Sequence, residues 1–323
     1  MQTFTDKLIA AIDEKKSILC AGLDPQAEHI PDYLKKKSVK EFKDPFEAAA
    51  ESFWEFNRLI IDAVAPYVAA VKPQAGFYEQ YGHYGIRTLE RTISYAKERG
   101  LVVILDAKRG DGSDTAIAYA RTYVGKVNLL DGSKSFSPVH VDALTVHTWI
   151  GRSCLDPFLQ EMKENGTGVF AVTKTSFVPN SAVENITAES GDPVWVEQAK
   201  MISEWGNGSE GEKGYRNLGV VMGATYPEDA IKMREILPNA WFLVPGYGAQ
   251  GGGAEGAVIG ADGKGFGIIV NSSRGITRAY LKGPFQKDLP EGLGFEQVAA
   301  QAAKHGRDEL NEALRKQGKA SWL

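Results

Sequence analysis

Residues 105–116, LDAKRGDGSDTA, gather charged side chains directly after the apolar run LVVI. If this run is a strand, Asp106 and Lys108 point to the same face, roughly 6.6 Å apart along the chain, and can meet over one ligand. Asp111 follows the Gly110 turn and can project sideways. Solvated surface ion pairs are the alternative. A charge cluster at the end of a buried strand favours acid–base catalysis instead.

Two further strand ends supply a second acid and a second base. Lys72 ends the run YVAAVKPQ, and Asp24 ends the run SILCAGLDP. Together with Asp106 and Lys108 they could alternate as ammonium and carboxylate, and each carboxylate would raise the pKa of the ammonium beside it. Such an array suits a reaction that expels an anionic group and then needs a proton at the carbon left behind.

A glycine-rich stretch and an arginine predict a phosphate site. VPGYGAQGGG (244–253) offers a loop rich in backbone amides, and NSSRG (271–275) places Arg274 after the next strand. Residues 246–251 also fit G-x-G-x-x-G, but no amphipathic helix and no acidic strand end follow, as a dinucleotide site would require. We interpret the stretch as a phosphate-binding loop; a long surface loop is the alternative.

Eight short apolar runs alternate with helix-like segments along the chain. Their near-continuous apolarity is typical of parallel strands buried on both faces. The pattern predicts an α/β fold, a (β/α)8 barrel forming one domain over residues 1–323, with an open doubly wound sheet as the rival. We expect insertions near 26–43, 177–192 and 206–216. The eight expected strands lie within residues 17–25, 67–74, 101–111, 141–147, 168–176, 217–225, 241–248 and 267–275.

Composition excludes several classes of protein. The 323 residues carry a net charge of −4, which lacks the basic excess of nucleic-acid binders. Cys20 and Cys154 are the only cysteines and form no CxxC pair, and the five histidines show no metal-binding spacing. The N-terminal residues are spaced as a helix rather than as a signal peptide, and no segment is long enough to cross a bilayer. We therefore expect a cytoplasmic protein without a metal, nucleic-acid or membrane partner.

The ordered motifs resemble those of one enzyme family. They are GLDP, VKPQ, LDAKRGD followed by Thr115, KTS, PGYGAQGG and SSRG, between about residues 17 and 276. This set is similar to that of orotidine 5′-phosphate decarboxylase, particularly its longer bacterial branch. The resemblance implies a homodimeric barrel with shared active sites, which converts orotidine 5′-monophosphate to UMP and CO2, the last step of pyrimidine nucleotide synthesis, without metal or cofactor.

The resemblance also implies a role for each matching residue. Lys108 would donate a proton to C6 of the pyrimidine, and Asp106 would lie against the departing carboxylate. Lys72 and Asp24 would hold the ribose hydroxyls. Asp111 and Thr115 would reach into the active site of the partner subunit. Ser176 would bind the edge of the pyrimidine ring, and Gln250 with Arg274 would bind the phosphate.

Two positions depart from the family pattern, and two other functions stay open. Gly112 stands where the family usually has an isoleucine that lines an apolar pocket, and Phe177 is an unusual residue after Ser176. Magnesium-dependent barrels of the same wider group share D-x-K-x-x-D, but they place an acid where this chain has Lys72, whose charge would repel the metal. A non-catalytic nucleotide-binding barrel is the second alternative.

Overall fold

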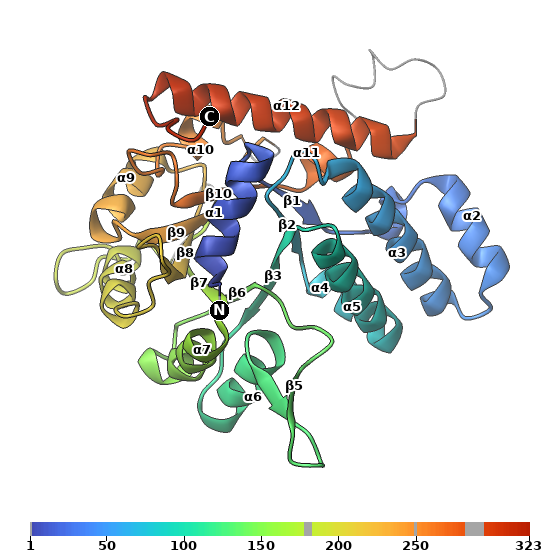
Figure 1. The fold of residues 1–323 in the computed structure, drawn as a ribbon, viewed down its shortest axis with the longest axis horizontal. Helices are drawn as coiled ribbons and strands as arrows, with labels where there is room; N and C mark the ends of the chain where they lie inside the picture. Colours follow the sequence, from blue (N-terminus) through green and yellow to red (C-terminus); the bar gives the residue numbers. More distant parts are fainter. Residues whose placement is uncertain (1, 178–182, 249–250, 282–293) are drawn as a thin grey trace.

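A computed structural model describes residues 2–177, 183–248, 251–281 and 294–323 of the chain. Its eight central strands are hydrogen-bonded in parallel and close into a barrel in the order β1-β10-β9-β8-β7-β6-β3-β2 (Figure 1). The predicted (β/α)8 barrel is therefore confirmed, and the open sheet is wrong. The barrel strands are β1 (Leu19–Leu23), β2 (Ala70–Pro73), β3 (Val102–Arg109), β6 (Ala143–Val146), β7 (Gly168–Lys174), β8 (Arg216–Met222), β9 (Ala240–Val244) and β10 (Ile268–Ser272).

Helices surround the barrel and connect its strands (Figure 1). Helices α3 (Pro45–Val64), α5 (Gly82–Glu98) and α8 (Val194–Trp205) lie between the expected strands. Gly100 follows α5 with a φ of 72°, a left-handed conformation that glycine adopts readily. The longer helices are α1 (Phe4–Lys15), α2 (Asp32–Glu41), α3 (Pro45–Val64), α5 (Gly82–Glu98), α6 (Ser113–Tyr123), α7 (Arg152–Asn165), α8 (Val194–Trp205), α9 (Pro227–Ile236) and α12 (Phe295–Lys316). The shorter ones are η1 (Ala27–His29), α4 (Gly76–Glu79), α10 (Ala254–Ala257) and α11 (Arg274–Thr277).

The expected insertions differ in what they contribute. Residues 26–43 hold η1 and the whole of α2, which lies at one edge of the molecule (Figure 1). The segment 206–216 packs on the start of α1, where the Asp6 carboxylate accepts the backbone N–H groups of Glu212 and Lys213 at 3.0 and 3.2 Å. This segment therefore ties a helix to the barrel rather than only decorating its surface. The segment 177–192 includes residues outside the described ranges.

An antiparallel hairpin was not predicted from the sequence. Its strands, β4 (Lys126–Asn128) and β5 (Lys134–Phe136), follow α6 and protrude from the barrel (Figure 1). The strands have three residues each and consist mainly of polar residues, so they lack the apolar alternation that marks a half-buried strand. Leu130, at the turn between them, is fully exposed.

Helix α1 covers the amino-terminal end of the barrel. The Phe4 N–H donates to the carbonyl of Gly166, just before β7, and the Thr5 N–H donates to the side chain of Asn217 in β8. The Phe4 ring is buried and meets the Phe170 ring edge to face, with centroids 5.7 Å apart. A Cβ on Gly168 would come within 2.2 Å of the Phe4 ring, so β7 needs glycine at this point. The opposite, carboxyl-terminal end of the barrel stays open for a site.

Replacing Phe4 by alanine should therefore destabilise the fold. Removing a fully buried phenyl ring leaves a cavity against Gly168 and Phe170, and we expect Phe4→Ala to lower the free energy of unfolding by about 3–5 kcal/mol. Urea denaturation measures this loss. Phe46→Ala is the matched control: Phe46 is 55% exposed, and its removal should cost less than about 1 kcal/mol. Equal losses in the two variants would contradict the role given to Phe4.

Candidate active site

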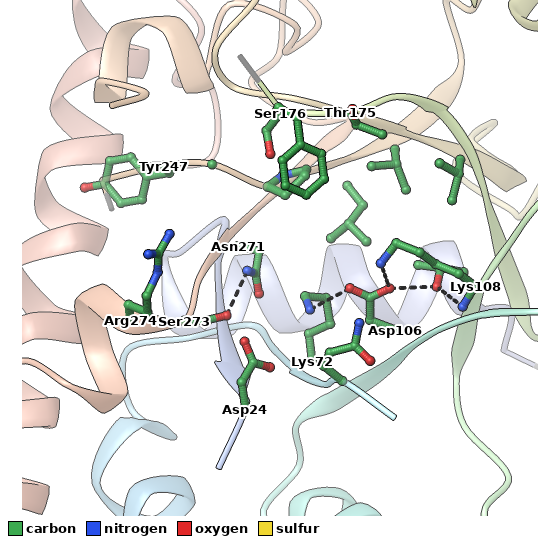
Figure 2. A pocket seen from close by; sticks show the side chains of 18 of the residues that line it. Asp24, Lys72, Asp106, Lys108, Thr175, Ser176, Tyr247, Asn271, Ser273 and Arg274 are labelled. Carbon is green, nitrogen blue, oxygen red and sulfur yellow. Dashed lines mark hydrogen bonds and ion pairs between the residues drawn. The ribbon is translucent and has the colours of Figure 1, made fainter. Parts of the chain in front are cut away.

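A cavity of about 490 Å³ opens at the carboxyl-terminal end of the barrel, and residues at or after the ends of all eight strands line it. Figure 2 shows the cavity with most of these side chains. Among the described residues, its charged lining consists of four cations and two carboxylates, a net charge of +2. Its apolar lining includes Val172, Val221, Leu243, Pro245 and Phe77. This is the location where barrel enzymes bind their substrates.

Asp106 lies between two lysines at the centre of the cavity's charged side. Its carboxylate oxygens are 3.0 Å from the Lys72 ammonium and 2.5 Å from the Lys108 ammonium (Figure 2). As the spacing predicted, the side chains of residues 106 and 108 meet. Lys72 reaches the same carboxylate from the neighbouring strand β2, which pairs with β3 in parallel.

The two lysines bias the ionisation of Asp106. Burial disfavours the charged form of this carboxylate, but the ammonium groups of Lys72 and Lys108 outweigh that effect and hold its pKa well below the usual range. Burial likewise disfavours the charged form of Lys72, and Asp106 and Asp24 reverse that effect, so the pKa of Lys72 is raised. The Lys72–Asp106 pair is therefore ionised throughout the neutral range.

Thr145 of β6 fixes the geometry of the array. Its hydroxyl donates to an Asp106 carboxylate oxygen at 2.9 Å and accepts the backbone N–H of Lys108 at 3.0 Å. Lys108 itself has a φ of 47°, in the left-handed region that a residue with a side chain rarely adopts. The pairing of β3 with β6 shifts register between Leu105 and Arg109. The strand thus leaves regular geometry at Lys108, and the threonine holds that conformation in place.

Asp24 follows β1 and lines the same cavity, but it forms no ion pair within the described residues. Its Oδ1 atom is buried and accepts no hydrogen bond from those residues. Its negative charge still raises the pKa of Lys72. The predicted array is therefore a direct Lys72–Asp106–Lys108 contact with Asp24 nearby, and this acid offers an acceptor oxygen to the cavity.

Basic and hydroxyl side chains from the end of β10 line another part of the cavity. Arg274 begins α11, and Ser273 precedes it (Figure 2). A Cβ on Gly22 of β1 would come within 1.8 Å of the Ser273 hydroxyl, so β1 has glycine where Ser273 packs. In the view of Figure 2, Arg274 and the lysine–aspartate array lie on opposite sides of the cavity. A ligand that spans the cavity can therefore contact the lysine–aspartate array with one end and bind Arg274 through an anionic group at the other end.

The loop after β7 forms a further side of the cavity. Ser176 is buried and lines it together with Thr175 and the largely exposed Phe177. Tyr226 donates its hydroxyl to the Phe177 carbonyl at 2.6 Å, and Thr225 donates to the Ser176 carbonyl at 3.1 Å. These contacts hold the backbone that carries Ser176. Gln250, the other residue expected on this side, lies outside the described residues.

Asp111 and Thr115 do not line the cavity of their own chain. Both are exposed near the start of α6, and among the described residues the Asp111 side chain accepts one hydrogen bond, from the neighbouring Gly112 N–H at 2.7 Å. A Cβ on Gly112 would meet nothing within 4 Å, so the position has open space around it. Residue 112 therefore adds no apolar side chain to the cavity of its own chain. The apolar lining of that cavity comes largely from β7, β8 and β9.

Sequence reasoning missed several residues of the cavity. Thr145 sits in a run that reads as an ordinary core strand, VDALTVH, and its polar side chain was the only signal. Arg278 lies four residues beyond Arg274, too far past the strand to be recognised as part of its end. Other missed polar lining residues include Gln26, Gln74, Thr175 and Asn271.

The described residues lack two other kinds of feature, a metal site and a membrane-spanning helix. Among the described residues, no three His, Cys, Asp or Glu side chains are grouped so that they could hold a metal ion. None of the helices in the described ranges has the length and apolarity needed to span a membrane.

The fold and the cavity define a (β/α)8 barrel of enzyme type, and comparison with known proteins identifies its family. The model of the family described as orotidine 5′-phosphate decarboxylase / HUMPS matches residues 17–283. Proteins named orotidine 5′-phosphate decarboxylase from Caldicellulosiruptor saccharolyticus and Rhodopirellula baltica are each 37% identical to this chain, covering 97% and 98% of it and 100% of themselves. The chain therefore belongs to the orotidine 5′-phosphate decarboxylase / HUMPS family.

Solved structures agree with this assignment. The Leishmania donovani OMP decarboxylase superposes with a TM-score of 0.70 at 27% identity, over 96% of this chain and 98% of that one. The Plasmodium berghei orotidine 5′-monophosphate decarboxylase, at 16% identity and a TM-score of 0.75 over 97% and 99% of the chains, shares the fold. The resemblance and the enzyme class predicted from the sequence are confirmed.

Neutralising Asp106 should destabilise the protein, because Lys72 would be left buried without its closest counterion. We expect Asp106→Asn to lower the free energy of unfolding at pH 7 by about 3–5 kcal/mol. Because the folded-state pKa of Asp106 is depressed, its contribution is complete above the unfolded pKa of about 4 and is lost as the pH falls towards the folded value.

Denaturant titrations at a series of pH values measure this effect. The difference between the wild type and Asp106→Asn should stay constant from pH 7 to about pH 5 and shrink below about pH 4. Asp13→Asn, at an exposed position on α1, is the control and should leave stability nearly unchanged. A difference that grows on acidification would show that Asp106 is not held ionised by the lysines.

Proposed function

We propose that this protein decarboxylates orotidine 5′-monophosphate to UMP and CO2, the last step of de novo pyrimidine nucleotide synthesis. The observation that carries the proposal is the contact of Asp106 with both Lys72 and Lys108 in a cavity that also holds Arg274. Membership of the family supports it as well. The single-domain organisation over residues 1–323 and a cytoplasmic location belong to the same proposal; the free thiols of Cys20 and Cys154 suit a reducing compartment.

The charge and size of the cavity suit this substrate. Orotidine 5′-monophosphate carries a phosphate at one end and a carboxylate on its pyrimidine ring. The net charge of +2 on the cavity lining complements these anionic groups, and a volume of about 490 Å³ falls in the range of small-molecule sites. The arginine side of the cavity would take the phosphate, and the lysine–aspartate array would face the reacting ring.

The reaction breaks the bond between C6 and the carboxylate carbon and leaves the electron pair on C6. No cofactor is invoked as an electron sink, so positive charge beside C6 must stabilise the developing carbanion. The Lys108 ammonium would supply that charge and then its proton, which gives UMP. Asp106, held ionised by the two lysines, would lie against the substrate carboxylate and disfavour the bound substrate relative to the product.

Lys108 suits the role of proton donor better than Lys72 does. The Lys72 side chain is only 5% exposed, and its raised pKa means that it holds its proton tightly. The Lys108 side chain is 38% exposed, so solvent can return a proton to it after each turnover. In this proposal Lys72 keeps Asp106 ionised and, with Asp24, binds the ribose hydroxyls.

The remaining substrate contacts follow the lining of the cavity. The buried acceptor oxygen of Asp24 would receive a ribose hydroxyl. Ser176 would bind the edge of the pyrimidine ring, and Arg274 would bind the phosphate. Gln250 would complete the phosphate site, although it lies outside the described residues.

A homodimer with shared active sites is part of the proposal. Asp111 and Thr115 are exposed and do not line the cavity of their own chain, so they are available to a second copy. Trp149 and Ile150, which follow the adjacent strand β6, are also exposed, and exposed apolar side chains of this size favour an interface. Each active site would then use Lys108 of one subunit and Asp111 of its partner.

Loss of the orotate absorbance in the presence of EDTA tests the proposed reaction. We expect the wild type to convert orotidine 5′-monophosphate to UMP at a rate that EDTA does not change. Because Lys108 supplies both charge and proton, Lys108→Ala should lower turnover by about a hundredfold or more while UMP still binds.

Each alternative gives a different result in this assay. Loss of turnover in EDTA with recovery on adding magnesium would favour the metal-dependent barrels of the wider group. Binding of UMP with no change in absorbance of the substrate would favour a non-catalytic nucleotide-binding barrel. Near-normal turnover of Lys108→Ala would remove the assigned proton donor. Lys316→Ala, on the exposed surface of α12, is the matched control and should behave as the wild type.

Mixed dimers test the shared site. Lys108→Ala and Asp111→Ala should each be inactive alone. In a dimer with one subunit of each kind, the site built from the intact Lys108 and the intact Asp111 is restored, so we expect up to half of the wild-type activity per dimer. Differently tagged subunits, purified through both tags, provide the sample. Verified mixed dimers without activity would exclude a shared site.

A further inference from the structure

We propose that Arg278 is a second phosphate-binding arginine, which acts with Arg274 as a two-guanidinium clamp on the phosphate group of the substrate. The inference rests on the proposed function and adds a residue that determines specificity for a phosphorylated nucleotide over its nucleoside. It stands on three observations: the two arginines share one turn of chain, they line one cavity, and neither forms an ion pair with another described residue.

The backbone places the two arginines side by side. Arg274 begins the short helix α11, and Arg278 is the residue that ends it, with its N–H donating to the Arg274 carbonyl at 3.2 Å. Residues four apart on a helical turn project from the same side, about 5–6 Å apart at Cβ. Both side chains line the cavity that also contains Asp106 and Lys108. The single turn therefore delivers two guanidinium groups to one side of the cavity.

Among the described residues, no carboxylate forms an ion pair with either arginine. Within the described residues, the side chains of Arg274 and Arg278 form no ion pair and no hydrogen bond, although Asp24 and Glu28 lie close enough to influence Arg278 electrostatically. Partial burial and the neighbouring positive charge of Arg274 lower the pKa of Arg278. Two like charges are thus held near each other without a directly paired counterion in the described parts of the chain.

An anion bound between the arginines would relieve that repulsion. A phosphate monoester has three terminal oxygens and up to two negative charges, which match two guanidinium groups better than one. The arginine side of the cavity suits the phosphate better than the substrate carboxylate. Lys72 and Lys108 already supply cations for the carboxylate on the other side of the cavity. Asp24 sits between the two groups of cations in the view of Figure 2, where a sugar would join ring to phosphate.

Binding of UMP and of uridine to the same variants tests this role. Arg278→Gln removes hydrogen bonds between a charged side chain and the phosphate, so it should weaken UMP binding by about ten- to a hundredfold. Uridine has no phosphate, so its binding should not change. Arg278→Lys keeps the charge without the bidentate geometry and should give an intermediate loss. Titration calorimetry measures UMP, and saturation-transfer NMR measures uridine.

A double-mutant cycle separates a shared phosphate site from two independent effects. If both arginines grip one phosphate, the losses of UMP affinity in Arg274→Gln and Arg278→Gln should not add in the double variant. Arg315→Gln, on the exposed last turn of α12, is the matched control and should bind UMP as the wild type does. Unchanged circular dichroism spectra and melting temperatures establish that the variants are folded.

The steady-state constants give an independent readout. If Arg278 contacts the phosphate equally well in the bound substrate and in the transition state, Arg278→Gln should raise KM with little change in kcat. If the contact is stronger in the transition state, the substitution should lower kcat as well. Both patterns support a phosphate contact when uridine binding is unchanged. An unaltered affinity for UMP and an unaltered KM in folded Arg278→Gln would overturn the inference, as would equal losses for UMP and uridine.

The outcome for Arg278 is distinguishable from the outcome for the proposed reaction. Wild-type protein that binds UMP through both arginines but leaves orotidine 5′-monophosphate intact would refute the reaction and keep the phosphate clamp. Wild-type protein that decarboxylates the substrate, with a folded Arg278→Gln variant that does so at the same KM, would refute the clamp and keep the reaction.

Discussion

Asp106 carries its charge in a largely buried position, and two lysine ammonium groups, at 3.0 and 2.5 Å, make that possible. Removing a carboxylate from water is costly unless close cations and hydrogen bonds compensate. The compensation requires Lys72 from β2, Asp106 and Lys108 from β3 and Thr145 from β6 to meet at one point. The neighbouring positions of these three strands in the closed barrel are thus a condition for the charged site.

The two lysines differ in ways that divide their roles. Lys72 is nearly inaccessible and is influenced by two carboxylates, so it acts as a fixed positive charge. Lys108 lies two residues after Asp106 in the chain. Its backbone has left-handed dihedral angles, and its side chain lines the cavity. The strained backbone at this residue matches the general tendency for strain to be stored at functional sites.

Sequence alone predicted the barrel and much of its polar rim, because both follow from local patterns. Buried parallel strands read as apolar runs, and Asp24, Lys72 and Asp106 interrupt those runs at their ends. Thr145 and Arg278 were missed because their roles depend on neighbours far apart in the chain or on the path after a strand. The hairpin β4–β5 was missed because its short polar strands carry no periodic signal. The Gly112 position also needed coordinates, since open space around a glycine leaves no trace in the sequence.

Several hydrogen-bonding groups of the cavity have no partner among the described residues. They favour a ligand that has both hydrogen-bond donors and an anionic group. Asp24 presents a buried acceptor oxygen without a donor from the described residues, and Asn271 presents another. The side chains of Arg274 and Arg278 present donors that have no acceptor among the described residues. A buried polar group that lacks its partner costs free energy, so a protein keeps several of them in one cavity when a bound molecule completes them. A sugar supplies hydroxyl donors and a phosphate supplies acceptors, whereas a purely apolar ligand supplies neither. The unsatisfied groups thus favour a phosphorylated nucleoside on grounds that do not depend on the lysine–aspartate array.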